Sequence, residues 1–190
     1  RNPIETAILD AGSGSYTYTF ENADRANLYG VELDVKKNLD FMGMRNFSVV
    51  LNGSLMKSRV DFDDESLEHD RPLQGQSPYL VNAGLFYQSP KLGLTVGVLY
   101  NRIGKRIVGI GRSDMSVGGS IDNDIPDMYE MPHNALDVVV SKSFGKHWEL
   151  KFNVKDLLNE EVQFAQFPKF ENGGDVGSRK EITKQLTAGR

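Results

Sequence analysis

The chain has 190 residues, of which 39% are hydrophobic and 25% are charged, and its formal net charge is −4. An isoelectric point near 5.4 excludes the strongly basic surface typical of nucleic-acid binding, so no nucleic-acid partner is expected. Cysteine is absent from the sequence, which excludes a disulfide framework, a thiolate zinc site and a cysteine nucleophile.

Hydropathy predicts no transmembrane helix, because no apolar run approaches the roughly 18 residues that such a helix needs. The mean hydropathy of −0.41 would ordinarily indicate a water-soluble chain. A transmembrane β-strand escapes this test, since it needs only about 9–11 residues with apolar side chains at alternate positions. The first residues are polar and include no initiator Met, so we expect the chain to start within a longer protein.

Strand-like alternation dominates the chain, and convincing helical periodicity is missing. Residues 1–25 are expected to form a loop and a strand that precede the clearest pattern. In the next run, Val31 and Leu33 alternate with Glu32 and Asp34, which gives one apolar and one charged face. The predicted antiparallel strands are 26–38, 46–59, 78–88, 92–101, 135–144 and 147–156. The fold class is therefore all-β.

The connections between these strands alternate in length. Short segments rich in turn formers lie at 38–45, 89–91 and 145–146. Long polar segments lie near 61–76, 107–131 and 157–178. In outer-membrane barrels the short turns face the periplasm and the long loops face the outside of the cell. The alternation of short and long connections therefore favours an up-and-down membrane barrel.

The content of the two faces separates a membrane barrel from a soluble one. A small soluble core needs large, varied side chains inside, whereas the polar face here holds Gly, Asn, Ser, Thr and charged residues that suit a wet lumen. Val and Leu occupy the middle of the strands on the other face, and aromatic residues gather near the strand ends. Rings favour the level of the lipid headgroups, so we predict membrane-interface positions for Phe47, Tyr79, Tyr87, Tyr100, Phe144 and Trp148. The alternative is that these rings cap an ordinary sandwich core.

Three segments resemble the C-terminal barrel region of TonB-dependent outer-membrane receptors. Residues 23–34, Ala-Asp-Arg-Ala-Asn-Leu-Tyr-Gly-Val-Glu-Leu-Asp, are similar to a recurrent strand of that family. Residues 150–159, Leu-Lys-Phe-Asn-Val-Lys-Asp-Leu-Leu-Asn, are similar to its most recognisable late strand. Between them, Pro72 and residues 78–82 resemble a strand that re-enters the membrane after an extracellular loop.

The resemblance implies a plugged barrel of about 22 strands in the cell outer membrane that takes up a scarce nutrient. It implies three partners: outer-membrane lipid, an unidentified transported ligand of siderophore, vitamin or glycan class, and the TonB complex acting through an N-terminal plug. No segment matches the plug. Residues 26–190 would then be C-terminal barrel strands, and Gly189 and Arg190 would open the last strand.

Candidate ligand-binding residues lie in or beside the long connections. Asp61 and Asp63 belong to one acidic run, and Asp122 and Asp124 belong to another; both could bind a hard cation, although solvated loops are the favoured interpretation. Basic side chains follow the strand 92–101 toward the outside and could meet a lipid phosphate or an anionic ligand, with plain solvation again favoured. These are Arg102, Lys105 and Arg106.

No catalytic or metal-binding pattern is recognised, and no cofactor is expected. His69, His133 and His147 lack ligand spacing, and no Gly-x-Ser-x-Gly element occurs. The sequence leaves three alternatives to a receptor: a soluble lipocalin-like barrel that binds an apolar ligand, a stand-alone outer-membrane barrel of about eight strands with a structural or adhesive role, and, least favoured, a hydrolytic barrel.

Overall fold

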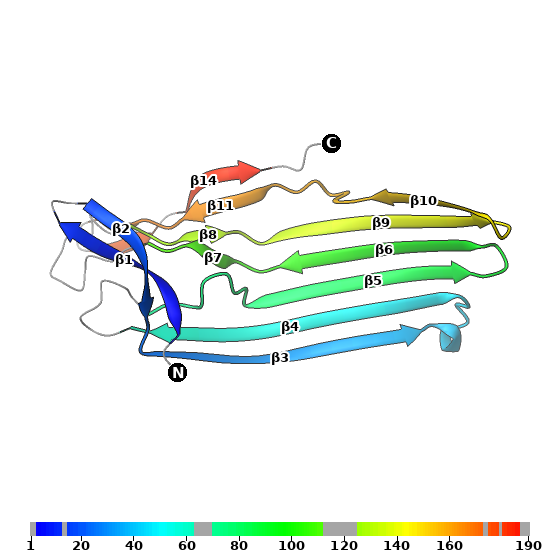
Figure 1. Ribbon diagram of the computed structural model, residues 1–190, viewed down its shortest axis with the longest axis horizontal. Coiled ribbons are helices and arrows are strands. Elements are labelled where there is room, and N and C mark those ends of the chain that lie inside the picture. The colour runs from blue at the N-terminus through cyan, green and yellow to red at the C-terminus, as the bar shows by residue number, and fades with distance from the viewer. Residues whose placement is uncertain are drawn as a thin grey trace.

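The structure is a computed structural model that describes residues 3–12, 15–62, 70–111, 125–172, 175–178 and 180–186. In this part of the chain it is all-β, with one short 3-10 helix, η1 (Asp40–Met42). The largest sheet is six-stranded and antiparallel (Figure 1). Its strands, in spatial order, are β3 (Arg25–Asn38), β4 (Phe47–Asp61), β5 (Tyr79–Ser89), β6 (Leu94–Ile103), β9 (His133–Phe144) and β10 (Trp148–Val154).

This architecture confirms the predicted all-β, antiparallel fold class, and each of the six predicted strands is present. Most boundaries differ from the predicted ones by one or two residues, and the strand predicted at 92–101, for example, begins at Leu94 and ends at Ile103. Gly93 has a φ of 58°, and its backbone N–H donates to the carbonyl oxygen of Pro90 at 3.2 Å. Leu92 and Gly93 therefore belong to the turn between β5 and β6, because a left-handed residue ends the extended conformation.

A second, four-stranded sheet lies next to the loop end of the first one. It contains, in spatial order, β7 (Arg106–Gly109), β8 (Met128–Glu130), β11 (Val162–Gln166) and β14 (Glu181–Leu186). Figure 1 shows β7 following β6, β8 leading into β9, and β11 following β10. These short strands lie within or beside segments for which the sequence predicted only polar connections.

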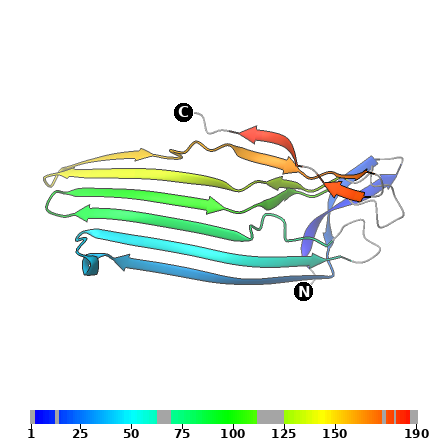
Figure 2. The same ribbon diagram turned by 180° about the vertical axis from the view of Figure 1, so that it is seen from behind.

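Two hairpins complete the described elements. They are β1 (Ile4–Gly12) with β2 (Ser15–Asn22), and β12 (Lys169–Asn172) with β13 (Asp175–Ser178). The turns β3–β4, β5–β6 and β9–β10 lie at one extremity of the sheet, which we call the turn end. Both hairpins lie at the opposite extremity, the loop end, where β4 and β7 end and β8 begins (Figures 1 and 2). Within the described ranges, no helix is long and apolar enough to cross a membrane.

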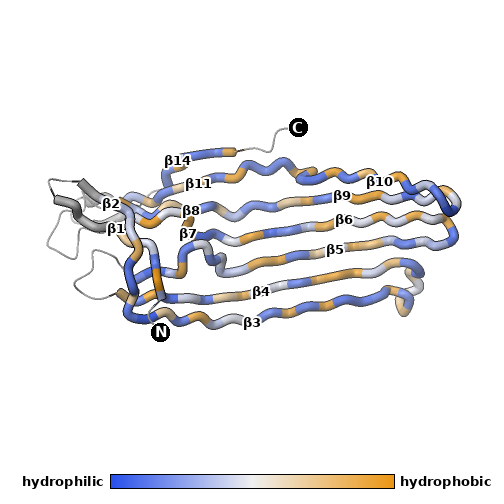
Figure 3. The backbone as a smooth tube through the Cα atoms, viewed as in Figure 1, coloured by the Kyte–Doolittle hydropathy of each residue, from blue (hydrophilic) through white to orange (hydrophobic). Residues whose placement is uncertain are grey.

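The strand register gathers the apolar side chains of the large sheet on one face. Cross-strand partners share a face, so one row runs from Val35 through Leu51, Ala83 and Tyr100 to Leu136. A neighbouring row contains Val49, Leu85, Val98, Val138 and Val154. We call this side of the sheet the apolar face. Figure 3 shows the corresponding alternation of hydrophobic and hydrophilic residues along each strand.

The opposite side, the polar face, carries a ladder of amide side chains. Asn101 Nδ2 donates to Asn82 Oδ1 at 2.5 Å, and Asn82 Nδ2 donates to Asn52 Oδ1 at 3.2 Å. Asn52 Nδ2 then donates to Glu32 Oε1 at 3.2 Å. The ladder therefore joins β6, β5, β4 and β3 through their side chains, in addition to the backbone hydrogen bonds of the sheet.

An aromatic ring also lies on the polar face. The Phe86 ring covers Gly84 and Gly97, so that a Cβ atom at Gly84 would lie 2.8 Å from Phe86 Cε2 and one at Gly97 would lie 3.0 Å from Cδ1. The ring can approach the backbone this closely only because both positions are glycine.

Hydrophobic burial is concentrated at the loop end. The buried hydrophobic residues of the described chain are Ala7, Ile8, Ala23, Val60, Ile107, Ile110 and Ala165. Large side chains on the long strands are instead exposed: Val31 is 73% and Leu55 67% exposed. We call this buried part at the loop end the cap. Beyond it, no described residue covers the exposed side chains of the long strands.

The β1–β2 hairpin covers the polar-face side of the sheet at the loop end. Val60 shares its face with the polar-face residues of β4 and is fully buried, whereas the Arg59 side chain on the other face is 65% exposed. Arg71 pairs with Val60 through an isolated bridge, and its Nη1 lies 3.3 Å from Glu5 Oε2 of the hairpin. Since the Arg71 side chain is only 1% exposed, this ion pair fastens the hairpin to the sheet from within the cap.

Candidate functional site at the loop end

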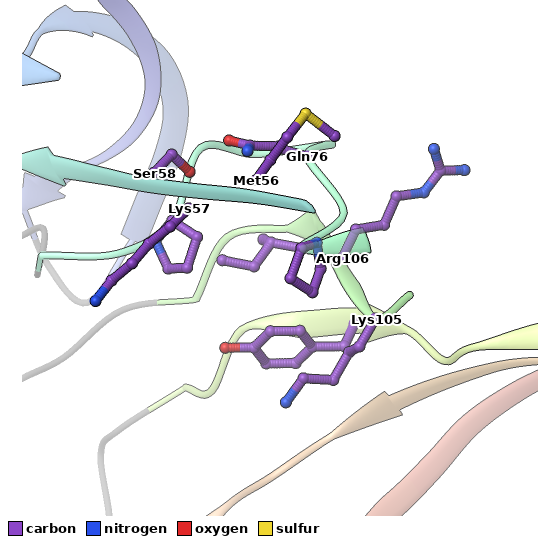
Figure 4. Close-up of a pocket in the computed structure, with 10 residues that line it drawn as sticks. Met56, Lys57, Ser58, Gln76, Lys105 and Arg106 are labelled. Carbon is purple, nitrogen blue, oxygen red and sulfur yellow. The ribbon is translucent and has the colours of Figure 1, made fainter. Parts of the chain in front are cut away.

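A cavity of about 280 Å³ lies between the loop-end part of β4 and the β7–β8 pair (Figure 4). The segment that follows the loop between β4 and β5 forms part of its lining. This segment is fixed at both sides: Leu73 N–H donates to Ser58 Oγ at 3.0 Å, and Gly75 N–H donates to the carbonyl oxygen of Ile107 at 2.8 Å. The cavity is therefore built from parts of the chain that are distant in sequence.

The lining combines an apolar surface with basic side chains, and none of the described residues that line it is acidic. Its apolar members are Met56, Pro72, Pro78, Ile107 and Tyr129. Its polar members are Lys57, Ser58, Gln76, Lys105 and Arg106. Because the positive charges have no carboxylate within the lining itself, the site has the electrostatic character of an anion-binding pocket.

The three basic side chains have different partners. Arg106 is paired with Glu130, with Nη2 2.8 Å from Oε2, and Figure 4 shows its side chain extending away from the two lysines. Lys105 Nζ lies 4.4 Å from the centroid of the Tyr129 ring and 5.0 Å from that of Phe167. Lys57 forms no ion pair with any other described residue. Of the three, Arg106 is therefore the one that pairs with a carboxylate of the described residues.

Tyr129 forms part of the cavity lining and also packs against the cap core of Ile8, Ile107 and Ile110. Burial raises the pKa of its phenol above the ordinary value, and the Asp127 carboxylate raises this pKa further, although Arg71 acts in the opposite direction. The Tyr129 hydroxyl is therefore a neutral group at physiological pH.

Arg102 lies on the apolar face rather than in the cavity, at the loop end of the sheet. Its Nη1 donates to Asn134 Oδ1 at 2.7 Å and its Nε to the Tyr79 hydroxyl at 3.3 Å. The Tyr100 hydroxyl also donates to Asn134 Oδ1, at 2.6 Å. Arg102 and Arg106, which are close in sequence, are thus held in separate environments.

The acidic candidates do not form a site in the described part of the chain. Asp61 accepts from Arg59 Nε at 2.5 Å and is held in an exposed ion pair. Asp63, Asp122 and Asp124 lie outside the described residues, as do His69 and the final Gly189 and Arg190. Among the described residues, no three His, Asp or Glu side chains come together as metal ligands.

The predicted interface aromatics lie on the apolar face in two groups. At the turn end, the rings of Phe47 and Tyr87 are 4.9 Å apart, and Phe144 is the cross-strand partner of Trp148. Trp148 is 77% exposed. At the loop end, Tyr79 and Tyr100 contact the Arg102 cluster. Their role at a lipid interface remains a prediction.

Lys57 and Gln76 line the cavity, but the sequence suggested no role for either. Lys57 occupies the same alternate positions of its strand as the apolar residues Val49, Leu51 and Leu55. A charged residue at an otherwise apolar position could have marked Lys57 as a candidate. Gln76 lies in an irregular segment whose position depends on contacts with β4 and β7, so no local pattern marks it.

Comparison with known proteins identifies the fold. A family model described as TonB dependent receptor-like, beta-barrel, matches residues 1–157. The chain belongs to this family. The match includes the β1–β2 hairpin and all six strands of the large sheet, and it confirms the resemblance stated from residues 23–34 and 150–159. Searches of the curated proteins and of the solved structures found no match.

The TonB-dependent receptor-like barrel family consists of outer-membrane receptors and transporters. Membership of this family also accounts for the open sheet. The described strands form part of a wall that closes only in a larger barrel, and the edge strand β3 has a partner on one side alone among the described strands.

Proposed function

We propose that this chain forms part of the wall of a TonB-dependent receptor in the cell outer membrane, and that the receptor takes up a nutrient ligand actively. The observation that carries the proposal is the apolar face of a barrel-family sheet. Its rows of Val, Leu and aromatic side chains run across six adjacent strands without a covering layer in the described structure.

The energetics favour lipid as the medium outside this face. Fully burying a Val, Leu or Phe side chain is worth roughly 1.5–3 kcal/mol, and the face leaves many such side chains exposed. Strands β3, β4, β5 and β6 have 14, 15, 11 and 10 residues, which is enough to cross a bilayer, since a transmembrane strand needs about 9–11. A lipocalin-like barrel would instead turn its apolar face inward around a ligand.

In this arrangement residues 26–190 supply C-terminal barrel strands. The segments near 61–76, 107–131 and 157–178 face the outside of the cell, and the turn end faces the periplasm. Energy would reach the barrel from TonB through a plug in the N-terminal part of the complete receptor. The loop-end cavity would then be among the first surfaces that a ligand meets.

Fractionation of cells that produce the complete receptor tests the proposal. We expect the protein in the outer-membrane fraction, with electrophoretic mobility that changes on boiling because a closed barrel resists detergent until heated. Recovery of the folded protein from the soluble periplasm would overturn the proposal and favour the lipocalin-like alternative.

A further inference from the structure

We infer that the loop-end margin of the apolar face binds the phosphate groups of lipids in the outer leaflet of the membrane. The side chains that carry the inference are Lys57, Arg102 and Lys105, which we call the basic belt. The inference rests on the proposed receptor role in the outer membrane and deepens it, because it names the lipid group that the barrel wall recognises. The chemistry of the face, its height, its charge and its hydrogen bonds support this assignment.

The apolar face becomes basic toward the loop end along two of its strands. On β4 its alternate positions continue from Leu55 to Lys57, two residues later. On β6 they continue from Tyr100 to Arg102. Figure 4 shows the side chain of Lys105 extending to the same side of β4 as that of Lys57. A surface that is apolar along the strands and basic at one margin matches a lipid leaflet, in which phosphate-bearing headgroups border the hydrocarbon.

The length of β4 places this margin at the level of the headgroups. Lys57 lies ten positions after Phe47 on the same face. At ~3.3 Å per residue and a strand tilt of about 40°, ten positions cover ~25 Å along the membrane normal. The apolar band of a transmembrane barrel is also about 25 Å tall. With Phe47 at the periplasmic interface, Lys57 therefore lies at the outer one.

The charge of the belt has no counter-ion among the described residues. None of its three side chains forms an ion pair with a described residue, and Lys57 and Lys105 are exposed. The carboxylates of Asp61 and Asp70, also at the loop end, are held by Arg59 instead. The three belt side chains do not require one shared phosphate, because a layer of headgroups offers a separate phosphate to each.

Hydrogen bonds hold the guanidinium group of Arg102 in a fixed plane and leave part of it free. Its Nε donates to the Tyr79 hydroxyl at 3.3 Å and its Nη1 to Asn134 Oδ1 at 2.7 Å. Its Nη2 forms no hydrogen bond with a described residue. A guanidinium whose plane is already fixed loses little freedom when it binds a phosphate oxygen. Arg102 is therefore preorganised to donate to a headgroup.

Native mass spectrometry of the complete receptor, purified from outer membranes and freed of lipid in detergent, tests the inference. The receptor is mixed with equal amounts of dioleoyl phosphatidic acid and dioleoyl phosphatidylcholine, which share their acyl chains and differ in headgroup charge. We expect the receptor to retain phosphatidic acid about fivefold more than phosphatidylcholine. Inorganic phosphate at the same concentration should not displace phosphatidic acid, because it gains nothing from the apolar face.

Variants assign this preference to the belt. Lys57→Gln, Arg102→Gln and Lys105→Gln should each lower the preference for phosphatidic acid, and the triple variant should retain the two lipids equally. Lys36→Gln is the matched control, because it removes the same charge from the polar face of β3, and it should leave the preference unchanged. Retention of the boiling-dependent mobility shift shows that each variant is folded.

The inference is overturned if the folded receptor retains the two lipids equally, if the triple variant keeps the original preference, or if Lys36→Gln lowers it as much as Lys57→Gln. Displacement of phosphatidic acid by inorganic phosphate would overturn it too, since the site would then recognise a free anion. Each of these results leaves the proposed receptor role intact, because that role is judged by membrane fractionation. Recovery of the folded protein from the periplasm would instead overturn the receptor role itself.

Discussion

At the scale of single residues, the stability of the cap depends on the environment of its charges. The pair of Arg71 and Glu5 is buried and joins residues that are far apart in sequence, whereas the pairs of Arg59 with Asp61 and Asp70 are exposed. Solvent screens the exposed pairs, so only the buried pair is expected to contribute strongly to the position of the β1–β2 hairpin.

Glu5→Gln should therefore release the hairpin. Removing the charge of one partner in a buried ion pair costs about 3–5 kcal/mol, because the attraction between Arg71 and Glu5 is strong in a medium of low polarity. Limited proteolysis of the receptor in detergent should show faster cleavage at the loop end. Arg59→Met is the control and should leave the cleavage rate nearly unchanged, because solvent screens its ion pairs with Asp61 and Asp70. Equal cleavage rates in the two variants would contradict the anchoring role.

A second prediction at this scale concerns the ring on the polar face. Gly84→Ala should displace the Phe86 ring, since the new Cβ would lie 2.8 Å from Cε2, and the barrel should lose about 1–3 kcal/mol of stability. Phe86→Leu in the same chain should restore part of this loss by removing the clash. Thermal unfolding of the single and double variants measures both effects. Additive losses would contradict the contact.

At the scale of the strand, alternation decides which face of the sheet each side chain joins. Val138 belongs to the apolar face, where its cross-strand partners are Val98 and Val154. Val139 belongs to the polar face, where its partners are Gly97 and Asn153. Two adjacent valines in one strand therefore have opposite surroundings.

Val138→Arg should impair assembly, because a charged side chain on the lipid face near the bilayer midplane costs roughly 2–4 kcal/mol. Val139→Arg should be tolerated, because its side chain would enter a wet lumen. The fraction of receptor that reaches the outer membrane in a folded, boiling-sensitive form measures both variants. Equal assembly of the two would show that the faces were assigned to the wrong media.

The same alternation explains what could be predicted at this scale. The six long strands were predicted because ten or more residues of period-two pattern are visible locally, and turn residues mark their ends. Strands β7, β8 and β11 have 4, 3 and 5 residues, and their existence depends on pairing with distant segments. The cavity could not be foreseen for the same reason, since Lys57, Gln76, Lys105 and Tyr129 meet only after folding.

At the scale of the whole molecule, the open edge of the large sheet determines whether the chain associates with other chains. β3 has 14 residues and pairs only with β4 among the described strands, so its outer edge presents a long row of unpaired backbone groups. Such an edge is a template for pairing with another chain unless the remaining strands of a barrel cover it.

The 190-residue chain produced alone should therefore aggregate through its edges. We expect sedimentation of β-rich material and a far-UV circular dichroism spectrum of strand type, whereas the complete receptor purified in the same detergent should remain dispersed. A monodisperse, folded fragment in detergent would contradict the prediction and would favour a small stand-alone barrel.

The amide ladder on the polar face has a directional consequence. Glu32, when ionised, can only accept hydrogen bonds, so Asn52 must present its Nδ2 to it, which leaves Asn52 Oδ1 to accept from Asn82, and Asn82 Oδ1 to accept from Asn101. One carboxylate on the edge strand β3 thereby fixes the orientation of the amide dipoles on β4, β5 and β6, so that the three side-chain amides point the same way along the row.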